Sequence, residues 1–263
     1  DEPGKKDITL EGNISFVHAD FRYPHTGIHA VKDFSLDIRK GEKIAIVGKT
    51  GSGKSTIAQL LLRMYDVQDG SIQYDGIAVN SIALGSLRSQ ISYVPQDVFL
   101  FSDTISNNIK FGNTGAGKDD VERAARSASI YNEIQKFEAG FETMVGERGV
   151  TLSGGQKQRI SIARALIKDP EIVIFDDCLS AVDGKTEQEI IGNLYTYLRE
   201  KTAIIITHRI FSLFRFDKII VMDEGRIAEQ GTHEELLQKG GIYAEMFARQ
   251  QATEKGRKEA GNG

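Results

Sequence analysis

The feature that most constrains this chain is a glycine-rich stretch, residues 48–56, which reads Gly-Lys-Thr-Gly-Ser-Gly-Lys-Ser-Thr. Its spacing, G-x-x-x-x-G-K-[ST], is that of a loop that wraps the phosphates of a nucleotide. Residues 44–47 before it are apolar, and 57–64 after it carry apolar side chains at helical spacing. The order strand, loop, helix predicts a nucleotide-binding α/β core. An ordinary glycine-rich turn, the alternative explanation of this stretch, would not require a strand before it and a helix after it.

The chemistry of phosphate binding accounts for the composition of this loop. Glycine has no Cβ, so the backbone can approach the phosphates and point its N–H groups at them. The positive end of the following helix faces the same anion, Lys54 adds a mobile cation, and the Ser55 hydroxyl can bind Mg²⁺. The residues predicted to contact the nucleotide here are Gly48, Thr50, Gly51, Ser52, Gly53, Lys54, Ser55 and Thr56.

Apolar, β-branched runs predict further strands of this core. They cover 172–175, 203–206 and 218–221. Strands buried on both faces suit a mainly parallel sheet, with the helical stretches between them as crossovers. Residues 97–163 differ in character and predict a helical insertion into the α/β core.

The segments around this core are also readable. Residues 14–40 predict short strands, with Phe34, Leu36 and Ile38 alternating with polar residues. The helix after the loop is expected to run to about Tyr65. Thr232 and Glu235 form a plausible capping box, and a charged tail from about Ala252 is expected to be disordered.

Composition excludes several classes of function. The net charge is −4 and no basic stretch precedes the C-terminal tail, so no nucleic acid is expected as a partner. The single cysteine, Cys178, cannot form an internal disulfide and fits a small packed residue better than a nucleophile. No apolar run approaches the roughly 20 residues of a membrane helix, and the N-terminus lacks the apolar stretch of a signal peptide.

The strand predicted at 171–177, with its apolar run 172–175, ends in two carboxylates, Asp176 and Asp177. Ligands of α/β sheets gather at the carboxyl ends of the strands. We therefore expect Asp176 beside the phosphate loop, holding Mg²⁺ directly or through water, and Asp177 facing the attacking water. A solvated turn is the alternative, and the nearby phosphate loop favours the functional interpretation.

A second anion site is predicted at residues 152–156, Leu-Ser-Gly-Gly-Gln, which precede an amphipathic helical run. Ser153 is a natural N-cap, and Gly154 and Gly155 leave bare N–H groups at the positive end of the helix. An ordinary capped helix is the alternative.

Three single residues are further candidates. Gln96 follows an apolar run and could bond to the water shell of a metal. His208 follows the strand at 203–206 and could donate a hydrogen bond to a γ-phosphate, and Tyr23 could offer a ring face to a base. Taken alone, each has a plainer explanation, as a polar loop residue, a packed or capping histidine, and a core aromatic.

Together these motifs resemble the nucleotide-binding domain of an ABC transporter over roughly residues 12–247, in the order of that family. Residues 152–156 are similar to the ABC signature, 48–55 to Walker A and 172–176 to Walker B. The remaining matches are Gln96 in the Q-loop, Asp183 in a D-loop at 180–183, His208 as the switch histidine, and Tyr23 as the A-loop aromatic that stacks on adenine.

The resemblance implies an α/β fold with a P-loop (RecA-like), mainly parallel sheet core, an N-terminal antiparallel β-subdomain and an inserted α-helical subdomain. The chain would divide into a linker from a membrane domain (1–13), the β-subdomain with the first part of the core (14–96), the helical subdomain (97–163), the second part of the core (164–250) and a flexible tail (251–263).

The resemblance also implies ATP and Mg²⁺ as cofactors and head-to-tail dimers. Each ATP would lie between Walker A of one domain and the signature of another domain. The resemblance assigns nucleotide contacts across the dimer to the signature residues Ser153, Gly154, Gly155 and Gln156, and a further nucleotide contact to Asp183. It assigns metal binding to Ser55, Gln96 and Asp176, and catalysis to Asp177, His208 and Gln96.

Two segments, 96–105 and 145–149, resemble the exporter branch of the family. That branch implies a transmembrane domain as partner, expected in the same full-length chain, and a location at the cytoplasmic face of a membrane. Phe99, Leu100 and Phe101 are candidates for the contact with that domain, or equally for core.

One position departs from the family pattern. The residue after the Walker B aspartate is normally glutamate, and here it is Asp177, one methylene shorter. A catalytic carboxylate must reach the water that it activates. We hypothesise that this site binds ATP but hydrolyses it slowly, as in one half of a heterodimeric exporter whose partner is a different subunit. Alternatives are a nucleotide-binding regulatory module with negligible turnover and a soluble ABC ATPase.

Overall fold

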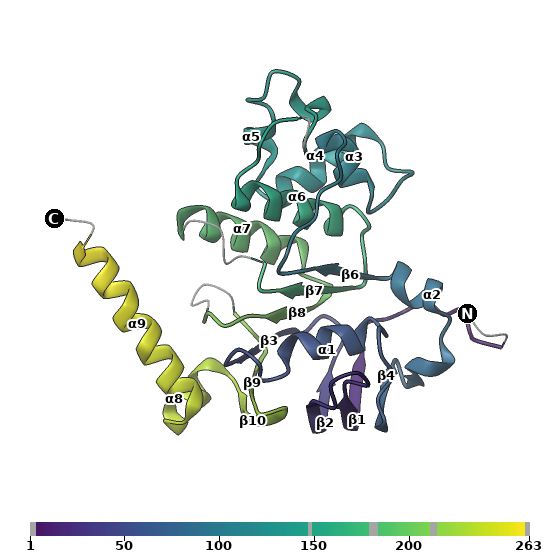
Figure 1. Ribbon diagram of the computed structural model, residues 1–263, viewed down its shortest axis with the longest axis vertical. Coiled ribbons are helices and arrows are strands. Elements are labelled where there is room, and N and C mark those ends of the chain that lie inside the picture. The colour runs from purple at the N-terminus through teal and green to yellow at the C-terminus, as the bar shows by residue number, and fades with distance from the viewer. Residues whose placement is uncertain (1–3, 147–148, 179–183, 211–214, 261–263) are drawn as a thin grey trace.

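The computed structural model describes residues 4–146, 149–178, 184–210 and 215–260, which form two sheets and the helices packed on them (Figure 1). In chain order the elements are β1 (Ile14–Arg22), β2 (His29–Ile38), β3 (Lys43–Gly48), α1 (Lys54–Leu61), β4 (Asp69–Tyr74), β5 (Ile77–Ala78), the 3₁₀ turn η1 (Val79–Ser81), α2 (Leu84–Ser89), β6 (Ile91–Val94), α3 (Ile105–Lys110), α4 (Lys118–Ser127), α5 (Tyr131–Ile134), η2 (Gly140–Glu142), α6 (Gly154–Leu166), β7 (Ile172–Asp176), α7 (Gly184–Tyr197), β8 (Thr202–Ile206), β9 (Lys218–Asp223), β10 (Arg226–Gly231), α8 (His233–Lys239) and α9 (Ile242–Ala260).

The larger sheet carries the predicted core. Its strand order is β10-β9-β3-β8-β7-β6, and of its described strands only the edge strand β10 is antiparallel to its neighbour. The carboxyl ends of β3, β6, β7 and β8 therefore lie along one edge, and the loops that follow them meet there. The mainly parallel α/β core expected from the sequence is confirmed.

The smaller sheet has the order β2-β1-β4-β5 and is antiparallel throughout its described pairs. Phe34, Leu36 and Ile38 of β2 are buried, and the residues between them are exposed. Because side chains alternate between the two faces of a strand, this pattern places the apolar face of β2 against the rest of the domain. The N-terminal antiparallel subdomain is thereby confirmed.

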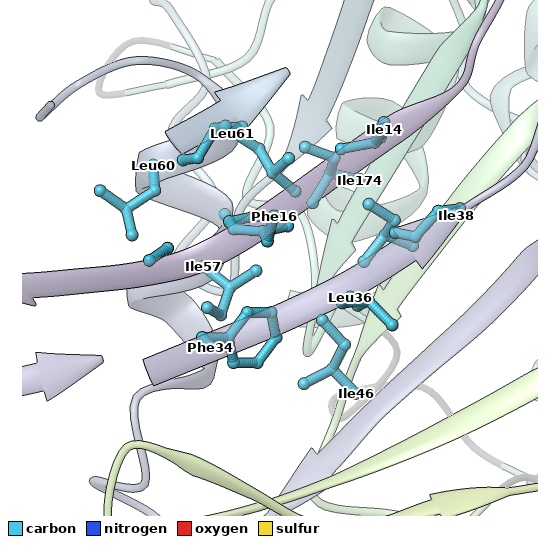
Figure 2. Close-up of a cluster of buried hydrophobic side chains, with 14 of the residues drawn as sticks. Ile14, Phe16, Phe34, Leu36, Ile38, Ile46, Ile57, Leu60, Leu61 and Ile174 are labelled. Atoms are coloured by element: carbon cyan, nitrogen blue, oxygen red, sulfur yellow. The ribbon is translucent and has the colours of Figure 1, made fainter. Parts of the chain in front are cut away.

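One hydrophobic core joins the smaller sheet to α1 and to the larger sheet, as Figure 2 shows. Its labelled members are at most 4% exposed and come from β1 (Ile14, Phe16), β2 (Phe34, Leu36, Ile38), β3 (Ile46), α1 (Ile57, Leu60, Leu61) and β7 (Ile174). Burial of these large side chains fixes α1, and with it the phosphate loop, relative to both sheets.

The helical insertion lies on the opposite side of the larger sheet from α1 (Figure 1). Val173 and Phe175 of β7 pack with α6 and α7, while Ile172 and Ile174 pack toward α1, so this strand is buried on both faces. Helices α3 to α6 confirm the predicted helical subdomain, although α6 continues to Leu166, past the boundary predicted at 163.

The helix after the phosphate loop is shorter than predicted. It ends at Leu61 rather than near Tyr65. The Tyr74 hydroxyl donates to the Leu61 carbonyl at 2.7 Å, the Arg88 guanidinium donates to the Leu62 carbonyl, and Arg63 has a left-handed φ of 48°. These tertiary donors satisfy the last carbonyls of the helix and stop it, an outcome that helical periodicity does not encode.

The two ends of the chain contact the domain or continue its helices. Part of the predicted linker 1–13 lies against the domain, because the Leu10 amide donates to Gln90 at 2.7 Å and Leu10 is buried. The tail predicted to be disordered from Ala252 is helical, since α9 continues to Ala260. Ala, Glu, Lys and Arg are strong helix formers, and extending an existing helix needs no new nucleus.

The capping box predicted at Thr232 and Glu235 is present at the start of α8. Within the described segments, no helix has the combination of length and apolar character needed to cross a bilayer.

Candidate functional site

The phosphate loop joins β3 to α1, and two of its glycines are required by close packing. At Gly48 (φ 152°) an added Cβ would lie 2.3 Å from the Met222 carbonyl oxygen of β9. At Gly53 (φ 101°) it would lie 2.3 Å from the Ala30 carbonyl oxygen of β2. A side chain at either position would displace backbone. These glycines therefore let the loop fit between two strands, a requirement that the sequence alone does not reveal.

The Lys54 side chain turns back into this loop. Its ammonium group donates to the carbonyls of Gly48 and Lys49, both at 2.8 Å. Burial lowers the pKa of Lys54, against the opposing attraction of Asp177 and Asp176. The Ser52 hydroxyl is buried and has no hydrogen-bond partner among the described residues. A half-buried cation and a buried hydroxyl without a partner in one loop suit an anionic ligand.

Asp176, at the end of β7, faces the start of α1. Its side chain is 4% exposed; Ser55 Oγ donates to Oδ1 at 3.2 Å and the Tyr93 hydroxyl donates to Oδ2 at 3.1 Å. Burial raises the pKa of Asp176 and the charge of Asp177 adds to it, while the bonds from Ser55 and Tyr93 act in the opposite direction. A hydroxyl and a carboxylate oxygen side by side are donors that fit Mg²⁺, which takes few protein ligands alongside phosphates.

Asp177 and His208 are in contact between the ends of β7 and β8. His208 Nδ1 lies 2.8 Å from Asp177 Oδ2, and the Thr207 hydroxyl donates to Oδ1 at 3.3 Å. The Asp177 amide also donates to the Ile206 carbonyl at 2.7 Å, and its φ of 47° is left-handed. The carboxylate is thus held toward β8 by two side chains, and the Asp177 backbone is held by a third residue.

These groups line one cavity of about 1050 Å³, large enough for a nucleotide. Of the residues predicted for the site, the cavity is lined by Tyr23, Gly48, Thr50, Gly51, Gly53, Lys54, Ser55, Thr56, Gln96, Asp176, Asp177 and His208. Four loops that are distant in sequence therefore meet at the carboxyl edge of the sheet, as the strand topology requires.

The rest of the cavity wall was not predicted. It comes from Ile28, His29, Ala30 and Lys32 of the β1–β2 region, from the β9–β10 turn, and from Met246 of α9. The Lys32 amide donates to the Gly225 carbonyl at 2.8 Å, which joins β2 to that turn. These residues carry no local motif, because they reach the site through sheet pairing or, for Met246, through the position of α9. Tyr93, whose hydroxyl donates to Asp176, was not predicted either.

The predicted signature residues lie outside this cavity, at the start of α6. Ser153 caps the helix by accepting from the Gln156 amide at 3.2 Å, and the Gln156 side chain accepts from the Ser153 amide at 2.9 Å. Gln156 then donates to Glu133 at 3.0 Å, and the buried Arg159 pairs with the same carboxylate at 2.5 Å. Ser153 and Gly154 remain exposed.

Some predicted residues lie outside the described part of the chain, and one lies in the core. Asp183 and the rest of the segment 180–183 lie outside the described residues, as do Glu147 and Arg148 of the segment 145–149. Cys178 is buried, and burial raises the pKa of its thiol, which fits a packed residue rather than a nucleophile.

Comparison with known proteins agrees with this geometry. A family model described as ABC transporter matches residues 31–180. A probable multidrug resistance ABC transporter ATP-binding/permease protein of Bacillus subtilis is 49% identical over 245 residues, which are 93% of this chain and 42% of that protein. The mitochondrial iron-sulfur clusters transporter ATM1 of Gibberella zeae is 43% identical over 255 residues, 95% of this chain and 36% of that protein.

Among solved structures, that of a bacterial Atm1-family ABC exporter with ATP bound aligns with a TM-score of 0.90 and 42% identity. The alignment covers 95% of this chain and 44% of that one. The chain therefore spans less than half the length of these relatives.

Proposed function

The chain belongs to the ABC transporter family, and we propose that it is the ATP-binding and ATP-hydrolysing motor domain of an exporter. The observation that carries this proposal is the cavity in which the phosphate loop, Asp176 with Ser55, and Asp177 with His208 come together. One site thereby offers amides and an ammonium for phosphates, oxygens for a metal, and a carboxylate for water.

The residues would divide the chemistry as follows. Loop amides and Lys54 hold the triphosphate, and Ser55 and Asp176 hold Mg²⁺, with Gln96 at the cavity wall as a further oxygen donor. Bound Mg²⁺ would supply charge neutralisation at the phosphate oxygens. Asp177 would orient the attacking water, and His208, which contacts the same carboxylate, would donate to the γ-phosphate.

Head-to-tail pairing with a second nucleotide-binding domain would complete the site. Ser153 and Gly154 are exposed at the positive end of α6 yet do not line this chain's own cavity. This exposure supports the proposal that they bind the γ-phosphate held by another domain. The family resemblance implies that Gly155, Gln156 and Asp183 join them there, although Asp183 lies outside the described residues. ATP would favour the closed pair because it contacts both domains only there.

We further propose that this chain's own site is slow and that its partner is a different subunit. Asp177 is a methylene shorter than glutamate, and its carboxylate is drawn toward His208 and Thr207. A carboxylate held there does not extend far enough to activate a water at the γ-phosphate, so the site would bind ATP but hydrolyse it slowly. A regulatory module that binds ATP without turnover is the second candidate, and the same Asp177 supports it.

The contact with a membrane domain would use an exposed aromatic cluster of the helical subdomain. Phe99 and Phe111 are 67% and 60% exposed, and Phe101 lies between them with ring centroids 5.1 and 4.6 Å away. Leu100 instead packs against the core. Exposed apolar rings of this kind mark contact sites. The domain would then lie at the cytoplasmic face of a membrane and drive substrate export.

Exchange of Ser153 tests the proposal. Ser153→Asp keeps an N-cap but points a carboxylate at the γ-phosphate of the partner site. We expect the variant chain to bind MgATP like the wild type, while ATP turnover by the assembled transporter falls about tenfold or more. Thr232→Asp, the same exchange at the capping box of α8, is the matched control and should change neither. Loss of the variant chain's own ATP binding would contradict the head-to-tail arrangement.

A further inference from the structure

We propose that Gln59 is a positioning residue for nucleotide binding, which acts by holding the hydroxyl of Tyr23 and so fixing the ring that receives the base. The inference rests on the proposed ATP site and adds to it a residue outside every motif described above. Gln59 lies on α1, one turn beyond Ser55 and three residues beyond Thr56.

The Tyr23 hydroxyl is held by two side chains of α1. It donates to Gln59 Oε1 at 2.8 Å, and it lies 2.9 Å from Thr56 Oγ1. A phenol has one proton to donate. With that proton on Gln59, the Thr56 hydroxyl is the donor of the other bond, so the three groups form a directed chain from Thr56 through Tyr23 to Gln59.

The rest of the Tyr23 side chain is held by ring contacts. Phe21 and Tyr65 meet it edge to face, with centroids 4.9 and 5.5 Å away and interplanar angles of 78° and 85°. Such contacts exclude water but permit rotation between rotamers. The hydroxyl bonds fix the far end of the side chain and leave one orientation of the ring at the cavity wall.

This arrangement builds both ends of the nucleotide site on one helix. The first turn of α1 faces the phosphates, and Thr56 and Gln59 on the same helix hold the ring at the base end. The distance between the two subsites is therefore set by a rigid element. Loss of the Gln59 contact should loosen the base end and leave the phosphate end intact.

Calorimetric titration of the chain with two probes, MgATP and magnesium tripolyphosphate, separates the two ends. Gln59→Leu keeps size and helix propensity but removes the acceptor. We expect it to weaken ATP binding about 3- to 10-fold, the worth of one net hydrogen bond, and to leave tripolyphosphate binding unchanged. Tyr23→Phe should cause a similar selective loss, and adding Gln59→Leu to it should cost nothing more.

Gln59→Glu supplies the matched control, because it keeps an acceptor for the Tyr23 hydroxyl. Its added charge acts on both probes, so the ratio of the two affinities should stay at the wild-type value. Equal losses for both probes in Gln59→Leu, no loss for either, or additive losses with Tyr23→Phe would overturn the inference. Failure of the wild type to bind either probe would instead overturn the proposed function, and this inference with it.

Discussion

Lengthening one side chain, Asp177→Glu, should speed ATP hydrolysis. In the present site the Asp177 carboxylate lies 2.8 Å from His208 Nδ1 and 3.3 Å from the Thr207 hydroxyl, at the end of β7. One more methylene carries the carboxylate about 1.5 Å farther along the cavity, past these two partners. The longer residue would then reach a water at the γ-phosphate.

The size of the effect follows from two opposing contributions. A well-placed general base is worth about 10²- to 10⁴-fold in rate. The extra methylene must fit beside buried groups, and such overpacking costs about 1–3 kcal/mol. If all of this cost raises the activation barrier, it slows hydrolysis roughly 10- to 100-fold. We therefore expect turnover at this site to rise about 10- to 100-fold.

The assay is steady-state phosphate release by the assembled transporter, before and after the exchange. Asp177→Asn is the control, since it keeps the length of the side chain but removes the base, and it should lower turnover or leave it low. Turnover unchanged by Asp177→Glu would refute the argument that reach limits this site.

Three further outcomes are expected. Burial holds the pKa of Asp176 above its unfolded value, so the stability that this group contributes is fully present below the unfolded pKa and is lost as pH rises through the folded pKa. Asp176→Asn removes a buried charge and should therefore raise Tm at neutral pH, yet abolish Mg²⁺-dependent ATP binding. An unchanged or lower Tm would contradict this explanation. Gly53→Ala should lower the free energy of unfolding in urea by about 2–4 kcal/mol, because the added Cβ meets the Ala30 carbonyl. Gly51→Ala, where no atom lies within 4 Å of the added Cβ, should lower it by about 1 kcal/mol. Equal losses would argue against the packing explanation. Cys178 should react with Ellman's reagent only as the protein unfolds, since burial raises its pKa, and rapid labelling of the native chain would disprove its burial.

Much of the site was predictable because its parts are locally encoded. The phosphate loop has a fixed spacing, and Asp176, Asp177 and His208 each follow a short apolar strand. Parallel strands bring their carboxyl ends to one edge, so the sequence alone predicts that residues far apart along the chain lie together.

The remaining features depend on tertiary contacts. The end of α1 is set by a hydroxyl from Tyr74, and the glycine requirement at Gly53 is set by a carbonyl of β2. The pair of Glu133 with Gln156, and the bond from Tyr93 to Asp176, each join separate elements. None of these has a sequence period or motif, because the partner is chosen by packing.

The helical tail was missed for a different reason. Its charged composition fits a disordered segment as well as a solvated helix. The deciding fact is that the preceding part of α9 is anchored, since Tyr243 is buried against β3 and β9.

The central claim is that the loop from Gly48 to Ser55 binds the triphosphate of a nucleotide, and titration calorimetry of the chain with MgATP tests it most directly. We predict a clear heat of binding for the wild type and for Lys40→Ala, which changes an exposed lysine outside the cavity. Lys54→Ala should weaken binding about 10- to 100-fold through loss of a charge-assisted contact. No heat with the wild type, or equal affinity in Lys54→Ala, would contradict the account.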